Sequence, residues 1–264
     1  IGFANLGLDP AHPTLPSLLK QQGYHSALIG KWHMGSLPDF GPLQSGYDEF
    51  WGNRSGGVDY FTHKIAGRGD LWDGDVPVEA VGYYTDLLGD RSLEFLDQRA
   101  AAPDKPWLLS LHFTAPHWPW EGNDAAGRAE SARIDATAST VPLGIAHYDG
   151  GTMQTYADMV TNLDANIGRV LTRLAQLGMQ QDTVVVFTSD NGGAWYNGIE
   201  NLNAPFRGWK ATFFEGGIRT PLFMRWPGGI APGTQRADVT GHLDIFSTIA
   251  AAARAAVPGD LTID

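Results

Sequence analysis

The chain has 264 residues, with 18 Lys and Arg against 29 Asp and Glu, so its formal net charge is −11. This charge argues against nucleic acid or an anionic membrane as a partner, because both would be repelled. The 43% hydrophobic content is enough for a buried core, and no apolar run reaches the roughly 18 residues of a membrane-spanning helix. There is no cysteine, which excludes disulfides, thiolate metal sites and a cysteine-derived nucleophile within these residues.

The first predicted unit is a helix over Thr14 to Gln22, followed by a strand over Tyr24 to Ile29. The strand runs into a glycine-bracketed segment that contains Lys31 and His33. Ligands of open α/β sheets gather outside the carboxyl ends of the strands, so these two side chains are candidate site residues. A single Lys or His in a loop is usually solvated surface, so their case depends on a matching site elsewhere in the chain.

Residues 36 to 80 are rich in Gly, Pro, Asp and aromatic side chains, which predicts loops and an edge hairpin. Within them, Tyr47 to Trp51 and Val58 to Thr62 are expected to be short extended pieces. Thr85 is the expected N-cap of a helix that reaches Arg99.

An apolar strand is predicted over Trp107 to Phe113, and it delivers His117 as the third polar candidate. His112 lies inside this strand and is expected to be a core histidine with a hydrogen-bond partner and no further role. Residues 121 to 150 show no clear period and are expected to form a surface insertion.

Apolar residues at steps of three and four predict one long helix from Met153 to Leu177. The next strand, residues 183 to 189, is β-branched and apolar, as is typical of a buried parallel strand, and it leads directly to Asp190 and Asn191. A carboxylate beside an amide oxygen suits a hard cation such as Ca²⁺ or Mg²⁺. The same residues also suit an Asx-type turn, and both readings remain open.

Lys210 follows a glycine-rich turn and is the fourth basic candidate. A strand over Pro221 to Trp226 and a helix over Leu243 to Ala253 complete the alternation of helices and strands. This pattern predicts one α/β domain over residues 1–264, with a mainly parallel or mixed central sheet flanked by helices on both faces.

Four motifs occur in this order: Gly30-Lys31-Trp32-His33-Met34-Gly35, Ala115-Pro116-His117-Trp118-Pro119, Thr188-Ser189-Asp190-Asn191-Gly192, and Arg207-Gly208-Trp209-Lys210 through Glu215-Gly216-Gly217-Ile218-Arg219-Thr220-Pro221. Together they resemble the type I, formylglycine-dependent sulfatases of the alkaline-phosphatase-like superfamily, and the resemblance covers nearly the whole chain.

The resemblance implies a sulfuric ester hydrolase in which Asp190 and Asn191 bind a calcium ion, with Mg²⁺ as the weaker choice. It also implies a substrate that is a small-molecule, carbohydrate or aryl sulfate ester, and a periplasmic, secreted or lysosomal-type compartment. The residues implied around the sulfate are Lys31, His33, His117 and Lys210.

These roles agree with the chemistry, because the oxygens of a sulfate ester repel a nucleophile until cations neutralise them. The proton for the leaving alkoxide is expected from His117 or Lys210, and His33 is expected to position or deprotonate the nucleophile. The sequence does not distinguish these assignments.

The family makes its formylglycine in a Cys-x-Pro-Ser-Arg segment, which follows a pair of aspartates, and neither segment occurs here. Both would lie before Ile1. We therefore expect a catalytic domain truncated at its N-terminus and lacking most of the C-terminal subdomain, inactive when alone. The alternatives are a phosphonate or phosphate ester hydrolase of the same superfamily, or a non-catalytic anion-binding homologue.

Overall fold

A five-stranded mixed sheet forms the centre of the computed structural model, which describes residues 6–137, 151–194, 199, 201–259 and 261. The strand order is β6-β5-β2-β1-β7, with β1 parallel to both of its neighbours. The extended piece predicted over Tyr47 to Trp51, within a loop region, is therefore part of an inner strand of the sheet, β2. The parallel strands are β1 (His25–Gly30), β2 (Glu49–Gly52) and β7 (Trp107–His112).

Two hairpins follow β2, and one of them is the predicted sheet edge. The hairpin of β5 and β6 pairs antiparallel with β2, and the hairpin of β3 and β4 stands apart from the main sheet. The short strands are β3 (Lys64–Ile65), β4 (Arg68–Gly69), β5 (Trp72–Asp73) and β6 (Val76–Pro77). The extended piece predicted over Val58 to Thr62 is wrong. There, Asp59 Oδ1 accepts the backbone N–H groups of Phe61 and Thr62 and closes a turn.

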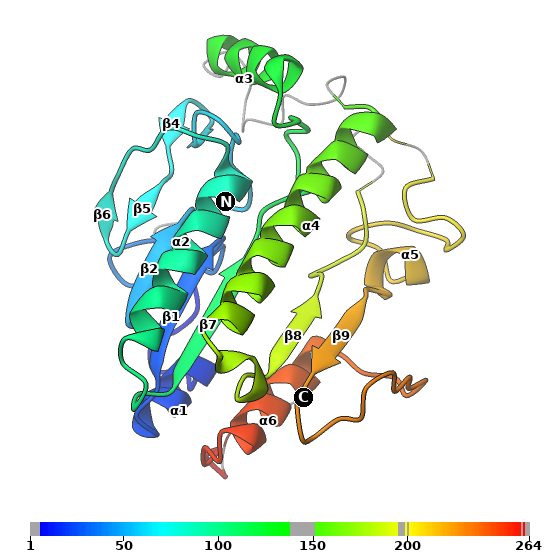
Figure 1. The fold of residues 1–264 in the computed structure, drawn as a ribbon. Coiled ribbons are helices and arrows are strands. Elements are labelled where there is room, and N and C mark those ends of the chain that lie inside the picture. The colour runs from blue at the N-terminus through cyan, green and yellow to red at the C-terminus, as the bar shows by residue number, and fades with distance from the viewer. Residues whose placement is uncertain (1–5, 138–150, 195–198, 200, 260, 262–264) are drawn as a thin grey trace.

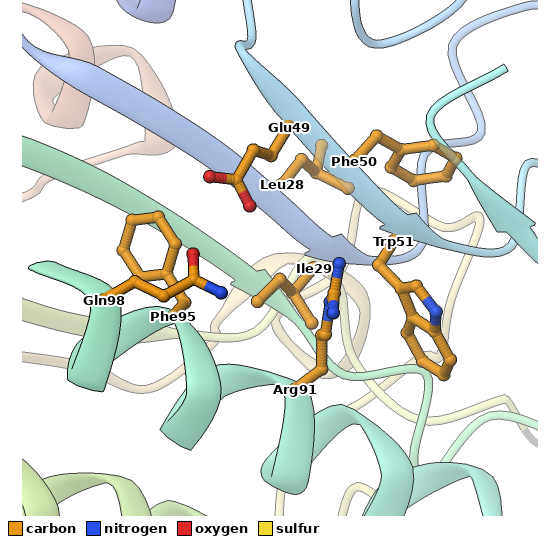
Figure 2. Close-up of a pocket in the computed structure, with 8 residues that line it drawn as sticks. All are labelled: Leu28, Ile29, Glu49, Phe50, Trp51, Arg91, Phe95 and Gln98. Carbon is orange, nitrogen blue, oxygen red and sulfur yellow. The ribbon is translucent and has the colours of Figure 1, made fainter.

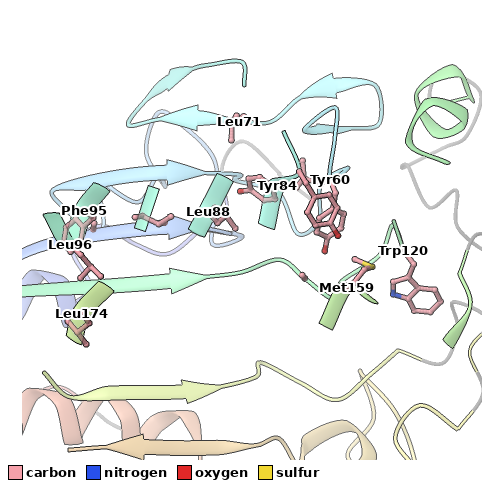
Figure 3. Packing of buried hydrophobic residues seen from close by; sticks show 14 of the residues in the cluster. Tyr60, Leu71, Tyr84, Leu88, Phe95, Leu96, Trp120, Met159 and Leu174 are labelled. Carbon is pink, nitrogen blue, oxygen red and sulfur yellow. The ribbon is translucent and has the colours of Figure 1, made fainter. Parts of the chain in front are cut away.

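Two long helices, α2 (Tyr84–Ala100) and α4 (Met153–Gln176), lie side by side over one face of the sheet (Figure 1). Between these helices and the strands lies the main core, drawn in Figure 3. The predicted cap at Thr85 is wrong, because α2 begins one residue earlier and the Thr85 hydroxyl is buried in its first turn. The predicted apolar stripe of α4 packs against the core through Tyr156, Leu163, Val170 and Leu174, but Met153 is 50% exposed and the unpredicted Met159 is fully buried.

A second, smaller cluster packs on the other face of the sheet, as the alternation of β1 shows. Ala27 and Ile29 belong to the main core, whereas Leu28 packs in a second cluster with Phe50 and Trp32. The helix α1 (Leu15–Gln21) packs on β1 and on α6 (His242–Ala252). Thr14 caps α1 as its side chain accepts the Ser17 N–H, so the predicted first helix is confirmed.

The strand leading to Asp190 is β8 (Val185–Thr188), and it pairs antiparallel with β9 (Leu222–Arg225) in a separate two-stranded sheet. The prediction of a buried parallel strand is therefore wrong for this segment, where Phe187 is 38% exposed. Figure 3 nevertheless shows β8 running in the same direction as β7.

Three shorter helices complete the described chain. The predicted insertion contains a helix, α3, and its residues 138–150 lie outside the described residues. Among the described helices, none is long and apolar enough to cross a membrane. The shorter helices are α3 (Ala125–Thr137), the 3₁₀ turn η2 (Met179–Gln181) and α5 (Glu215–Ile218).

Candidate active site

The first candidate pair follows directly from the end of β1. Lys31 N donates to the His112 carbonyl (3.0 Å) and His33 N donates to the Arg54 carbonyl (3.0 Å). The segment therefore continues between β7 and the residues after β2. Gly30 is required at the start, because a Cβ there would lie 2.0 Å from the His112 carbonyl oxygen. His33 has a φ of 56°, a left-handed conformation that aims its side chain away from the strand direction.

His112 corrects one prediction. It is exposed at the end of β7 rather than buried in the core, and its Nδ1 lies 3.0 Å from the Lys31 carbonyl oxygen. It does have the expected hydrogen-bond partner. Its effect on the site is to fix the backbone of Lys31 from the side chain as well as from the main chain.

His117 sits in a tight loop after β7. Its backbone N–H donates to the Thr114 carbonyl (2.8 Å), and its ring Nδ1 lies 2.7 Å from the Trp118 carbonyl oxygen. A carbonyl only accepts, so Nδ1 carries the proton and donates it. Nε2 is then the ring nitrogen left to exchange a proton with another group.

Lys210 and the loop after β8 are joined through Asn203. The Asn203 side chain accepts the Gly193 N–H (2.7 Å) and donates to the Gly193 carbonyl (2.8 Å) and the Gly208 carbonyl (3.2 Å). Lys210 N donates to the same Gly193 carbonyl (3.1 Å). The segment that carries Lys210 is therefore tied to the segment that carries Asp190. We call these contacts the Asn203 clasp.

Asp190 and Asn191 begin this loop. His242, at the start of α6, bonds through its Nε2 to the Ser189 carbonyl (2.9 Å) and so fixes the backbone just before Asp190. The Asn191 side-chain nitrogen donates to the Gly192 carbonyl (3.0 Å). That orientation leaves the amide oxygen of Asn191, together with the exposed Asp190 carboxylate, as the two oxygen ligands that this turn offers.

The pKa values show that these segments share one electrostatic environment. Burial lowers the pKa of Lys31, while Asp190 opposes that effect and Lys210 adds to it. Burial first, and then both lysines, lower the pKa of His117 to about 4, against the opposing effects of the Trp118 carbonyl and Asp190. His33 shows the same pattern, with its pKa lowered first by burial and then by Lys31.

The structure therefore brings Lys31, His33, His117, Lys210 and Asp190 into mutual electrostatic range. Two lysines lie near one carboxylate, so the cluster carries an excess of positive charge in a chain whose net charge is −11. A partly buried excess of positive charge favours binding an anion.

Two glycines that the sequence reasoning did not select lie against the histidines. A Cβ at Gly56 would lie 2.5 Å from Cε1 of His33, and a Cβ at Gly57 would lie 3.0 Å from Nδ1 of His117. These glycines let one backbone segment approach both imidazoles. The adjacent Gly-Gly pair in an otherwise aromatic segment is the sequence signal that could have identified them.

The metal ligands are incomplete among the described residues. In that part of the chain no group of three or more His, Asp or Glu side chains could hold a metal ion. Asp190 and Asn191 supply two oxygens, whereas calcium takes roughly 6 to 8. The residues present therefore fit part of a calcium site.

The hollow drawn in Figure 2 is a different place. It lies between α2 and the first two strands, with Ile29, Trp51 and Phe95 among its lining residues. None of the six candidate residues lines it. Its walls are mostly apolar side chains of the core, so it belongs to the packing of α2 on the sheet.

This fold and this cluster define a protein of the alkaline-phosphatase-like class. A model of the Sulfatase family matches residues 5–255, and the chain belongs to that family.

Relatives show the same assignment. The chain is 29% identical over 281 residues to the uncharacterized sulfatase YdeN of Escherichia coli strain K12, covering 98% of this chain and 46% of that protein. It is 30% identical over 279 residues to N-acetylgalactosamine-6-sulfatase of Mus musculus, covering 98% and 48%. The chain thus spans about half the length of the curated relatives it matches.

A solved structure gives the same result for the fold. The crystal structure of Ps i-CgsB in complex with k-i-k-neocarrahexaose superposes with a TM-score of 0.81 at 27% identity. The match covers 98% of this chain and 57% of that one.

Proposed function

We propose that the natural protein hydrolyses sulfate monoesters at the cluster formed by Lys31, His33, His117, Lys210 and Asp190. The observation that carries the proposal is the electrostatic convergence of both lysines and both histidines on Asp190, in a chain that belongs to the sulfatase family. A sulfate ester needs its oxygen charges neutralised before a nucleophile can attack. Lys31 and Lys210 supply that neutralisation.

His117 has the geometry for proton transfer to the leaving oxygen. Its Nδ1 donates a hydrogen bond to the Trp118 carbonyl, so Nε2 is the ring nitrogen available to exchange a proton with the substrate. Burial and the two lysines keep the imidazole neutral without an anion, since they lower its pKa to about 4. A bound sulfate group opposes the lysines, raises this pKa and lets Nε2 hold the proton that the leaving oxygen takes. Lys210 is the alternative donor, and His33 orients or deprotonates the nucleophile.

The finer chemistry of the site is also part of the proposal. Asp190 and Asn191 would hold a calcium ion through the carboxylate and the amide oxygen, and such an ion would supply positive charge that helps to neutralise the sulfate. These 264 residues contain no cysteine. A formylglycine nucleophile made from cysteine therefore comes from residues outside them.

Sulfated carbohydrates are the proposed substrate class. Support comes from the relative named N-acetylgalactosamine-6-sulfatase and from the similar structure in complex with a neocarrahexaose. The leaving group of a carbohydrate sulfate is a poorly stabilised sugar alkoxide, and a proton donor contributes most to the rate with such a leaving group.

The test is turnover of an aryl sulfate by the natural protein, including any residues beyond these 264. Lys210→Ala should reduce kcat/KM by about 10²- to 10³-fold, as for the loss of one preorganised charged donor. Lys105→Ala is the matched control, because Lys105 is exposed after α2 and should have no effect. Near-normal turnover by Lys210→Ala would remove that lysine from the mechanism.

A second comparison separates the two proton donors. The phenolate of an aryl sulfate whose phenol is more acidic leaves without protonation. Such a substrate should restore turnover in a variant that lacks the proton donor, but not in a variant that lacks a charge needed to neutralise the sulfate. We expect rescue for His117→Gln and none for Lys210→Ala. The opposite pattern would assign the proton to Lys210.

A further inference from the structure

Two carboxyl groups are buried outside the candidate site. Asp59 is 4% exposed in the turn before β3, and Glu121 is fully buried at the end of the His117 loop. Both have polar contacts that use only one of their two oxygens. Asp59 Oδ1 accepts the Phe61 N–H (2.9 Å), the Thr62 N–H (2.7 Å) and the Ser131 hydroxyl (2.8 Å).

The second oxygens of these carboxyls lack donors. Glu121 Oε2 accepts the Tyr60 N–H (3.0 Å), but Glu121 Oε1 and Asp59 Oδ2 are buried and receive no hydrogen bond from any described group. The two carboxyls lie within hydrogen-bonding reach of each other. Two buried carboxylates facing each other in this way would repel strongly, and each would have an unsatisfied oxygen.

Among the described residues, no cation bonds to the second oxygen of either carboxyl, and the guanidinium of Arg128 lies over the Phe61 ring instead. The ammonium group of Lys64 is paired with Asp135 (2.8 Å). Burial lowers the pKa of His63, which lies beside Asp59, so its imidazole stays neutral at neutral pH. The other ionisable groups facing Glu121 are Glu130 and the phenols of Tyr60 and Tyr83, and none of them is positive.

We propose that Asp59 and Glu121 form a carboxylic acid–carboxylate pair that holds one shared proton at neutral pH and positions the loop carrying His117. Glu121 is the acid and donates to Asp59, because Asp59 already accepts three hydrogen bonds that stabilise its charge. One proton satisfies both unpartnered oxygens at once. Burial, followed by the charge of Asp59, raises the pKa of Glu121 to about 9, in agreement with this assignment.

The pair reaches His117 through two tyrosines. The Tyr60 hydroxyl donates to the His117 carbonyl (2.9 Å), and the Tyr83 hydroxyl donates to the Glu121 carbonyl (2.7 Å). Their rings stack with centroids 5.3 Å apart. In the same segment as Asp59, Gly57 lies against the His117 ring. The turn at Asp59 thus contacts both ends of the segment from His117 to Glu121. The importance of this positioning for catalysis rests on the proposed function of His117. The proposal of a shared proton between Asp59 and Glu121 does not depend on that function.

The first experiment measures thermal unfolding between pH 5 and pH 9. The folded pKa of Glu121 is raised, so its contribution to stability is present below about pH 4.5 and is lost as the pH rises toward about 9. Glu121→Gln keeps a donor for Asp59 and an acceptor for Tyr60 without titrating. We expect its Tm at pH 8 to exceed that of the wild type by roughly 5 to 10 °C, with a smaller dependence on pH.

The control for this experiment is Glu94→Gln on α2, whose side chain is 60% exposed and pairs with Arg91. It should follow the wild type. A wild-type stability that depends on pH no more than Glu121→Gln would overturn the shared proton. So would an increase in Tm on adding Ca²⁺ that EDTA reverses and Glu121→Gln abolishes, because the carboxyls would then bind a cation instead.

The second experiment tests positioning through the His117 ring signals in NMR. Glu121→Gln should keep the His117 chemical shifts and titration, whereas Glu121→Leu, which cannot accept from Tyr60 or donate to Asp59, should move both. Tyr60→Phe removes only the hydroxyl bond to the His117 carbonyl and should move them in the same direction. Unchanged His117 signals in Tyr60→Phe and in a folded Glu121→Leu would refute positioning. Failure of sulfate hydrolysis alone would leave both experiments unaffected.

Discussion

The Asn203 clasp gives the sharpest quantitative prediction. Asn203→Ala removes the side-chain bonds at 2.7, 2.8 and 3.2 Å that join Gly193 to the segment before Lys210. Each such bond contributes about 1 kcal/mol net, and the longest contributes least, so the local opening free energy should fall by about 2–3 kcal/mol. At about 1.4 kcal/mol for each factor of ten, opening becomes roughly 30- to 100-fold more frequent.

Amide hydrogen exchange at Lys210 measures this opening. Its N–H donates to the Gly193 carbonyl, a bond that the substitution leaves in place, so faster exchange reports separation of the two segments and not direct loss of the acceptor. Asn123→Ala is the control, because Asn123 is exposed and its side chain donates to Asp86, far from the clasp in the sequence. Protection of the Lys210 amide within a factor of three of the wild type would show that the segments are held together by other contacts.

Three further predictions concern the candidate site. Gly57→Ala should displace the His117 ring and weaken sulfate binding about tenfold by titration calorimetry, whereas Gly69→Ala, with nothing within 4 Å, should not. His117 is neutral in the folded protein, so lowering the pH from about 6.5 to 4 should decrease the free energy of unfolding by about 1–3 kcal/mol. Urea unfolding measures this decrease, and His117→Gln should not show it. Calcium should bind these residues weakly, with Kd on the order of 1 mM, and Asp190→Asn but not Asp104→Asn should abolish the binding; a micromolar Kd would contradict the two-ligand site.

Strand-end reasoning indicated which polar side chains to consider, because it needs only the point at which an apolar run stops. Lys31 follows β1, His117 follows β7 and Asp190 follows β8, and each of these strand ends was readable from the sequence. The pairing partner of each strand was not readable from the sequence. The run before Asp190 has the composition of a buried parallel strand, yet β8 pairs antiparallel with β9, because composition records burial and not the partner.

Local polar contacts account for the other differences. The piece over Val58 to Thr62 was expected to be extended, but the Asp59 side chain takes the N–H groups that a strand would have used. On α4, Asn166 is buried because its side chain bonds to Asp86 and approaches Gly89 of α2. A search for apolar periodicity cannot find an interface made by an amide and a glycine.

The glycines and Asn203 of the site were missed for a related reason. Gly56 and Gly57 matter through what a side chain would displace, and Asn203 matters through bonds to backbone atoms of a distant loop. The adjacent glycines were visible in the sequence, but the groups that they and Asn203 approach were not. Such contacts are set by tertiary geometry.

The arrangement of the strands also affects how this polypeptide behaves in concentrated solution. Within the described part of the chain, β7 pairs with a strand on one side only, and β8 pairs only with β9. Each therefore presents a row of backbone donors and acceptors along an apolar segment, which is the usual template for intermolecular strand addition. Preparations of these residues alone should self-associate as concentration rises, with a β-rich infrared signature. A charged side chain introduced at Phe187, which is 38% exposed in β8, would be the first substitution to try against it.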